Sequence, residues 1–221
     1  MSKLAGLIFD CDGTLADTMP LHYVAWQRTM AEYEIPFPED RFYALGGQPT
    51  EAIVALLAGE HGKTVDVAQA AALKDQRFLE ALPQVQAVDW VAAIARKSFG
   101  SLPMAVGSGS SRTTVLQTLR RLDLLHLFPC VVAAEDTARH KPEPDVFLRA
   151  AEQMGVLPAH CLVYEDADLG IEAARRAGMQ CIDVRLPDAK RRAFAVAQRA
   201  NQDTNKPETT PSANRPTGQV D

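Results

Sequence analysis

Two aspartates two residues apart, Asp10 and Asp12, are the residues of this chain whose types and spacing most directly suggest chemistry. They follow the apolar run of residues 4–9, a pattern typical of a buried strand. Burying two like charges together costs free energy unless a cation or a reacting group compensates them. The pair therefore indicates a site for a metal ion, a phosphate group, or both.

Polar side chains also follow three later apolar runs. They are Ser108 after residues 102–106, Glu135, Asp136 and Lys141 after residues 131–134, and Glu165 and Asp166 after residues 161–164. Ligands of open parallel α/β sheets bind outside the carboxyl ends of the strands. We therefore expect these groups to meet Asp10 and Asp12 at one edge of a sheet.

The acidic residues of this set suggest metal-assisted phosphoryl chemistry. Asp10, Glu165 and Asp166 offer the hard oxygen ligands that Mg²⁺ prefers. With a phosphate present, Asp10 can attack phosphorus and form an aspartyl-phosphate. Asp12 is then close enough to protonate the leaving oxygen and afterwards to activate water.

The remaining members of the set are suited to holding a phosphate. Ser108 lies beside the small Gly109, so backbone N–H groups can approach an anion at the start of a helix. Lys141 supplies a compact, mobile cation that neutralises a phosphoryl oxygen.

Five continuous apolar runs predict the buried strands of a parallel sheet, and helical patterns separate most of them. The runs are residues 4–9, 102–106, 131–134, 161–164 and 181–184, and the helices are 88–99, 111–122, 145–154 and 168–177, the last with an N-cap at Asp168. This alternation predicts an α/β, doubly wound, mostly parallel (Rossmann-like) core.

One interval breaks the alternation with helix after helix, at residues 21–33, 50–57 and 67–82. It predicts an inserted helical cap. We expect the core to span residues 1–17 and 85–200, with a last helix at 187–200, and the cap to span 18–84. Residues 201–221 are predicted to be a disordered tail, because they contain too few apolar residues to offset chain entropy.

Composition excludes several classes of partner. The 221 residues have a formal net charge of -5 and no basic block, so we expect no nucleic-acid partner. No apolar stretch approaches the roughly 18–20 residues that cross a membrane, so we expect no membrane partner. Four cysteines without CxxC spacing and the lack of a signal-peptide pattern favour a cytoplasmic protein.

Four motifs in order resemble those of the haloacid dehalogenase superfamily. They are DCDGTL at 10–15, SGS at 108–110, HKPEPD at 140–145 and EDADLG at 165–170. The helical insertion resembles that of the β-phosphoglucomutase-like group. The resemblance covers residues 4–186 and implies the fold predicted above.

The resemblance also implies a role for each motif residue. Asp10 matches the nucleophile and Asp12 the general acid/base, while Ser108 and Lys141 match the phosphate binders. The implied Mg²⁺ ligands are Asp10, the backbone carbonyl of Asp12, and Asp166, with Glu165 in support. We thus expect Mg²⁺ as cofactor, a small phosphorylated sugar as substrate, and a monomer.

Within that group, the run GGQPT at 46–50 is similar to bacterial phosphatases of fructose 1-phosphate and 6-phosphogluconate. The mutases carry a cap arginine that holds a second phosphate, whereas Pro49 or Thr50 stands there in this chain. A cap lysine is also expected to be absent, with Glu80 near its place. Loss of those cations favours water as the acceptor, and so a phosphatase.

Four cap residues are candidates for contact with the sugar, namely His22, Trp26, Gly47 and Gln48. His22 lies one helical turn before Trp26 and fits either a helix surface or the active-site cleft. Trp26 also fits the core of the cap.

Three alternatives remain open. A β-phosphoglucomutase is the nearest enzymatic one. A non-catalytic phospho-acceptor resembling a response-regulator receiver uses a similar set of groups, but it lacks the cap and Asp12. A dehalogenase does not need the metal-binding acids.

Overall fold

The central sheet has five parallel strands in the order β5-β4-β1-β6-β7. The computed structural model describes residues 4–194. The strands are β1 (Gly6–Phe9), β4 (Met104–Gly107), β5 (Cys130–Val132), β6 (Cys161–Glu165) and β7 (Gln180–Asp183). All five predicted strands form, and their bounds differ from the predicted ones by at most two residues.

Strand β1 lies at the centre of this sheet, between β4 and β6. Leu7 is opposite both Met104 and Leu162, and all four residues of β1 are buried. Burial of every residue is expected of a parallel strand that helices cover on both faces. The residues that follow β1 consequently leave the sheet at the middle of its edge.

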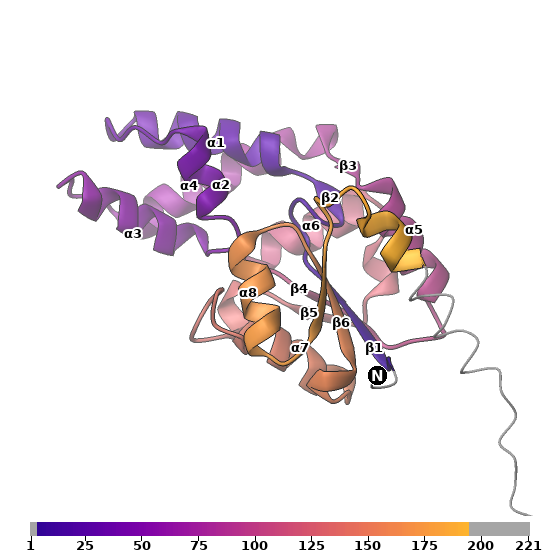
Figure 1. Cartoon of the computed structure of the whole chain (residues 1–221). Coiled ribbons are helices and arrows are strands. Elements are labelled where there is room, and N and C mark those ends of the chain that lie inside the picture. Colours follow the sequence, from indigo (N-terminus) through magenta and orange to yellow (C-terminus); the bar gives the residue numbers. More distant parts are fainter. Residues whose placement is uncertain (1–3, 195–221) are drawn as a thin grey trace, which may run out of the picture.

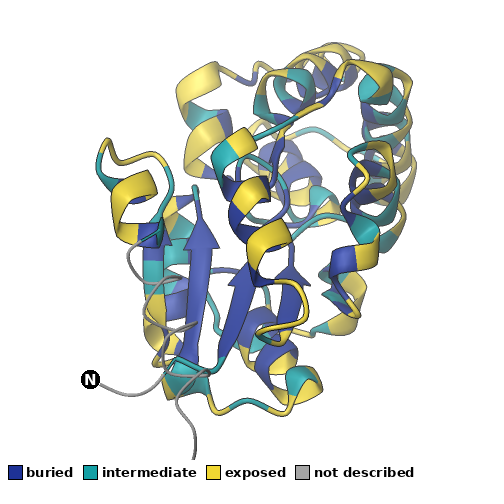
Figure 2. Ribbon diagram, turned by 90° about the vertical axis from the view of Figure 1, so that its right-hand side faces the viewer, coloured by how far each residue is buried: buried dark blue, intermediate teal, exposed yellow. Residues whose placement is uncertain are grey.

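Helices cover both faces of the sheet, as predicted for a doubly wound core. On one face α5 (Asp89–Ser98) and α6 (Arg112–Arg121) bury a cluster that includes Phe9. On the other face α7 (Asp145–Met154) and α8 (Asp168–Arg176) bury a cluster that includes Ile8. Neighbouring residues of one strand thus pack into two separate apolar clusters, one on each face of the sheet. Figure 2 shows the strands buried between the helical layers.

Four further helices have an apolar cluster of their own. They are α1 (Met19–Ala31), α2 (Glu39–Ala44), α3 (Thr50–Glu60) and α4 (Val67–Ala81). Their cluster contains Trp26, Phe42 and Leu57, and Figure 1 shows the four helices together at the end of the sheet toward which β1 runs. Helix α2 was not predicted, because its six residues are too few for a clear helical period.

The two chain segments that join the sheet to these four helices pair with each other. Strand β2 (Ala16–Asp17) runs antiparallel to β3 (Gln86–Ala87). Two residues per strand give no readable alternation, so the sequence did not predict this pair.

Shorter 3₁₀ turns complete the described chain. They are η1 (Leu82–Gln84), η2 (Leu125–Leu127), η3 (Ala134–Asp136) and η4 (Pro158–His160). The predicted N-cap of α8 was wrong, because Ala167 is the cap residue and Asp168 already lies in the helix. The predicted last helix is seen at residues 189–194, while its remainder and the tail lie outside the described residues.

Two further expectations can be compared with the described chain. None of the helices within residues 4–194 combines the length and the hydropathy needed to cross a bilayer. Cys11, Cys130, Cys161 and Cys181 are all free thiols.

Candidate active site

Asp10 shares a lysine with Glu165 at the middle of the sheet edge. Lys141 Nζ donates to Asp10 Oδ1 at 2.6 Å and to Glu165 Oε2 at 2.8 Å. All three residues are buried, and the backbone N–H of Asp10 extends the sheet by donating to Tyr164. Burial opposes a charge on Lys141, but the two carboxylates outweigh it and raise its pKa above the usual range.

Asp166 adds a third carboxylate to this edge. One oxygen atom each from Asp10, Glu165 and Asp166 lie within 4.8 Å of one another. Burial and repulsion by Glu165 raise the pKa of Asp166 to about 7, and the same two causes raise the pKa of Asp10 well above its usual value. A divalent cation would relieve this repulsion, so the donor set fits Mg²⁺.

Glu165 differs from the other two carboxylates because both of its oxygens already have protein donors. Its Oε1 accepts from the backbone N–H groups of Asp166 and Ala167 at 3.1 and 2.9 Å, and its Oε2 accepts from Lys141. Asp10 and Asp166 are therefore the better placed metal ligands, and Glu165 is better placed to orient Lys141.

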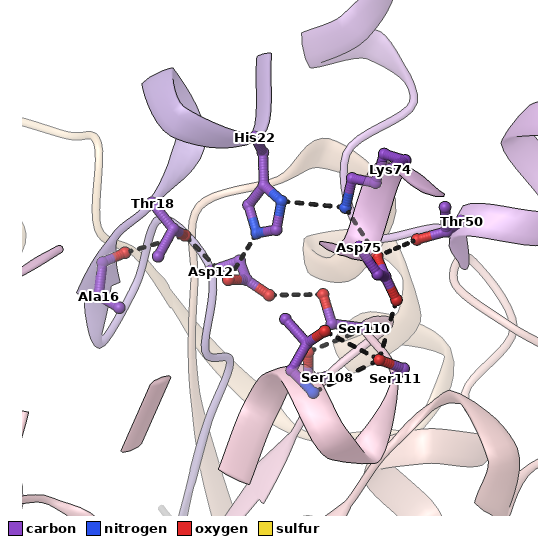
Figure 3. A network of polar contacts seen from close by, with 11 residues as sticks. Asp12, Ala16, Thr18, His22, Thr50, Lys74, Asp75, Ser108, Ser110 and Ser111 are labelled. Carbon is purple, nitrogen blue, oxygen red and sulfur yellow. Dashed lines mark hydrogen bonds and ion pairs between the residues drawn. The ribbon is translucent and has the colours of Figure 1, made fainter. Parts of the chain in front are cut away.

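Asp12 accepts three side-chain hydrogen bonds (Figure 3). Thr18 Oγ1 and His22 Nε2 reach its Oδ1 at 2.9 and 3.0 Å, and Ser110 Oγ reaches its Oδ2 at 2.6 Å. Burial would raise the pKa of Asp12, but His22 and the hydrogen bonds from Ser110 and Thr18 outweigh burial and hold that pKa well below its usual range. Asp12 is thus an oriented, ionised carboxylate.

His22 is held in one tautomer by a lysine of α4. Lys74 Nζ donates to His22 Nδ1 at 3.0 Å, so the ring proton is on Nε2, where it is donated to Asp12. Burial and the charge of Lys74 lower the pKa of His22, and the ring stacks on Phe78 at a centroid distance of 3.7 Å. Of the two predicted settings for His22, the structure places it in the cleft, where it is 4% exposed.

The expectation that the cap lacks a lysine in this region was wrong. Lys74 is 3% exposed, and it lines the same cavity as Asp10 and Asp12. Lys74 lies on the buried face of α4 with Ala70 and Phe78. A lysine in register with the apolar residues of a helix is the signal in the sequence that could have indicated a site residue.

The site residues surround a cavity of about 60 Å³ between the sheet edge and the four helices. The predicted residues that line this catalytic cavity are Asp10, Asp12, His22, Trp26, Gly47, Gln48, Ser108, Gly109, Glu165 and Asp166. Trp26 is 3% exposed and belongs to the apolar cluster of the helices as well. Lys141, also predicted as a site residue, does not line the cavity; it lies behind Asp10 and donates a hydrogen bond to that carboxylate.

The loop that precedes α3 touches the loop that follows β4. A Cβ atom on Gly109 would lie 2.1 Å from the carbonyl oxygen of Gly47, so only glycine fits at position 109 in this arrangement. Ser108 Oγ accepts from the backbone N–H of Ser110 at 3.0 Å, and its own proton can therefore point toward a ligand.

Glu135 and Asp136 do not join the site, contrary to the expectation for this strand end. Both oxygens of Glu135 accept from the backbone N–H of Arg112 at 3.0 Å, and Asp136 pairs with the Arg112 side chain. The two acids therefore stabilise the start of α6, where the helix dipole favours negative charge.

The family of the chain follows from its sequence. The profile of the family described as haloacid dehalogenase-like hydrolase matches residues 7–184, and this chain belongs to that family. It is therefore an enzyme of the hydrolase class.

Two curated relatives extend the comparison. Over 188 residues the chain is 40% identical to the fructose-1-phosphate phosphatase YqaB of Escherichia coli (strain K12), with 83% of this chain and 98% of the relative covered. It is 28% identical over 188 residues to the β-phosphoglucomutase of Bacillus subtilis (strain 168), with 82% of this chain and 83% of the relative covered.

A solved structure shows the same fold at lower identity. The crystal structure of β-phosphoglucomutase from Clostridium difficile matches with a TM-score of 0.79 at 19% identity, covering 91% of this chain and 98% of that one.

Proposed function

We propose that this chain is a Mg²⁺-dependent phosphatase that hydrolyses a small sugar phosphate, such as fructose 1-phosphate, through a phospho-Asp10 intermediate. The observation that carries the proposal is the placement of two aspartates in different environments on one loop. Asp10 is paired with Lys141, whereas Asp12 is ionised and oriented by three side chains. The similarity to a fructose-1-phosphate phosphatase supports the choice of substrate.

Each residue then has a defined task. A carboxylate oxygen of Asp10 attacks phosphorus as the bond from phosphorus to the sugar oxygen breaks. Asp12 is ionised before substrate binds, so it first takes up a proton from solvent as the phosphorylated substrate enters. It gives this proton to the departing sugar oxygen and, as a carboxylate again, later takes a proton from the water that hydrolyses the intermediate. Ser108 donates a hydrogen bond to a phosphoryl oxygen, and Lys141, which is paired with Asp10, supplies positive charge that offsets the negative charge of the phosphoryl group.

Three groups would hold the metal ion, namely Asp10, the backbone carbonyl of Asp12, and Asp166, with Glu165 in support. When bound, Mg²⁺ supplies positive charge that offsets the phosphate and the clustered carboxylates.

We also propose that residues 18–84 act as a cap over this site. Two observations support a cap. Side chains of α1 and α4 form one wall of the catalytic cavity, and the paired β2 and β3 are where a hinge would lie.

The test is phosphate release from a panel of hexose and triose phosphates with Mg²⁺ or with EDTA. We expect turnover that EDTA abolishes and that Asp10→Asn lowers by at least about 10⁴-fold. Asp40→Asn, which removes an exposed carboxylate from α2, is the matched control and should not change turnover. Undiminished turnover by Asp10→Asn would refute the mechanism.

A second candidate function, β-phosphoglucomutase, is favoured by one observation. Lys74 places a cation in the catalytic cavity, where a mutase needs positive charge to hold a second phosphate. Conversion of β-glucose 1-phosphate to glucose 6-phosphate in a coupled assay, faster than release of inorganic phosphate, would assign the chain to the mutases.

A further inference from the structure

The catalytic cavity is too small for a whole phosphorylated sugar. Its volume is about 60 Å³, whereas pockets for small molecules are typically about 300–1,000 Å³. A second cavity of about 300 Å³, here called the side cavity, lies between the same two layers, and Thr50 lines both. The part of a substrate beyond its reacting phosphate thus has a neighbouring space to enter.

Asp75 lines the side cavity, and Figure 3 shows its carboxylate beside Lys74 and Thr50, two residues that line the catalytic cavity. Its Oδ1 accepts from Thr50 Oγ1 and from Lys74 Nζ, each at 3.2 Å. Its Oδ2 accepts from Ser111 Oγ of the sheet layer at 3.0 Å. The carboxylate is therefore fixed at the wall of the side cavity, with Thr50 and Ser111 as neighbouring hydroxyls.

The charges around the side cavity disfavour an anion. Glu51, Asp75 and Glu135 line it, and His140 is the one basic side chain among the described residues that do so. Glu135 also accepts the hydrogen bond from the backbone N–H of Arg112, so this donor at the start of α6 is not free to bind a phosphate. Carboxylates accept hydrogen bonds from hydroxyl groups but repel a phosphate.

Lys74 and Arg112, the cations next in sequence to Asp75 and Ser111, are already bonded within the protein. Lys74 donates to His22 and Asp75, and the Arg112 side chain pairs with Asp136. A second phosphate entering the side cavity would have to compete with these partners.

We propose that the side cavity receives the end of the substrate remote from the reacting phosphate, and that Asp75, with Thr50 and Ser111, selects an uncharged, hydroxylated end over a second phosphate. The inference rests on the proposed phosphatase function and narrows its substrates to monophosphates.

The test compares fructose 1-phosphate with fructose 1,6-bisphosphate, which differ by one phosphate at the far end. Their dissociation constants are measured by calorimetry in Mg²⁺ buffer with the Asp10→Asn chain, which cannot turn them over. We expect at least about tenfold preference for the monophosphate, because like charges brought together disfavour the wrong ligand. Adding Asp75→Asn should reduce this preference about tenfold, since it removes one of the repelling charges.

The matched control is Glu80→Gln, which removes an exposed carboxylate from the same helix, outside both cavities. It should leave the preference unchanged. The ratio of kcat/KM for the two compounds, measured with Asp10 intact, should follow the same pattern.

Two results would overturn the inference. One is equal affinity of the Asp10→Asn chain for both compounds, and the other is an equal loss for both on Asp75→Asn, which would show that Asp75 acts only through Lys74. Absence of phosphate release by the native chain would refute the proposed function alone. The role of Asp75 would still be decided by the dissociation constants, because they do not depend on turnover. Absence of binding by either compound would overturn both.

Discussion

The sheet side and the helical side of the catalytic cavity contribute different kinds of groups. On the sheet side, Asp10, Glu165 and Lys141 form ion pairs at 2.6 and 2.8 Å. On the helical side, His22 and Lys74 line the same cavity. His22 donates to Asp12 of the sheet side, and Lys74 donates to His22 and to Asp75. The sheet edge thus holds charges of the kind that a phosphate site needs, whereas the helical side helps to orient Asp12, the carboxylate proposed for proton transfer.

The largest effect is expected at Asp12, which accepts hydrogen bonds from both sides of the catalytic cavity. Asp12→Asn keeps the shape of the side chain but cannot transfer the proton, so kcat should fall by about 10²–10⁴-fold with little change in KM. Steady-state kinetics with the preferred sugar phosphate measure this. An unchanged kcat would place proton transfer on another residue.

The next largest effect is expected at Gly109, where the loop after β4 touches the loop before α3. Gly109→Ala introduces a Cβ atom that would lie 2.1 Å from the Gly47 carbonyl oxygen, so one loop must move. A displacement of about 1 Å near a reacting centre can lower kcat/KM by about 10²-fold. Gly59→Ala in α3 is the control, because nothing lies within 4 Å of its added Cβ atom. Equal activity of both variants would show that the contact between the loops is dispensable.

A smaller effect is expected on the helical side alone. Lys74→Met removes the donor that fixes the His22 tautomer, a hydrogen bond to a charged group worth about 1.5–3 kcal/mol. A loss of this size lowers kcat/KM by roughly tenfold or more. Lys63→Met, at a lysine that pairs with exposed Glu34, is the control. If Lys74→Met behaves like its control, the helical side does not orient Asp12.

The smallest effect should appear in the sheet layer and in stability rather than activity. The Tyr164 hydroxyl is buried without a hydrogen-bond partner among the described residues, and its ring stacks on Phe9. Tyr164→Phe should raise the free energy of unfolding by about 1 kcal/mol, because it removes an unsatisfied buried group. Thermal or denaturant unfolding measures the change, and Tyr43→Phe, at an exposed tyrosine, should show none. A destabilised Tyr164→Phe chain would mean that the hydroxyl is satisfied after all.

The same division explains what the sequence could predict. The sheet-side residues follow continuous apolar runs, so strand ends and carboxylates can be read together, and Asp10, Asp166 and Lys141 were expected near one another. Residue type did not tell which way a strand-end side chain turns, and Glu135 therefore lies against Arg112 instead of in the catalytic cavity.

The helical side is harder to predict because its contacts depend on tertiary packing. Lys74 meets His22 only because α1 and α4 pack together, and the sequence separation of 52 residues carries no local signal of this. Thr14, Thr18 and Ser110 were also missed as partners of the aspartates. Serine and threonine are common in loops, so only the nearness of these residues to the DCDGTL and SGS motifs indicates that they belong to the site.

The pairing of β2 with β3 brings the two ends of the helical segment to one place, with Ala16 opposite Ala87 and Asp17 opposite Gln86. An insertion whose ends are neighbours can change in length or be exchanged without displacing a strand of the main sheet. A chimera that carries the helices of another hydrolase between these two strands should keep the chemistry of Asp10 and acquire the donor's choice of sugar. Such a chimera would separate reactivity from selectivity within one chain.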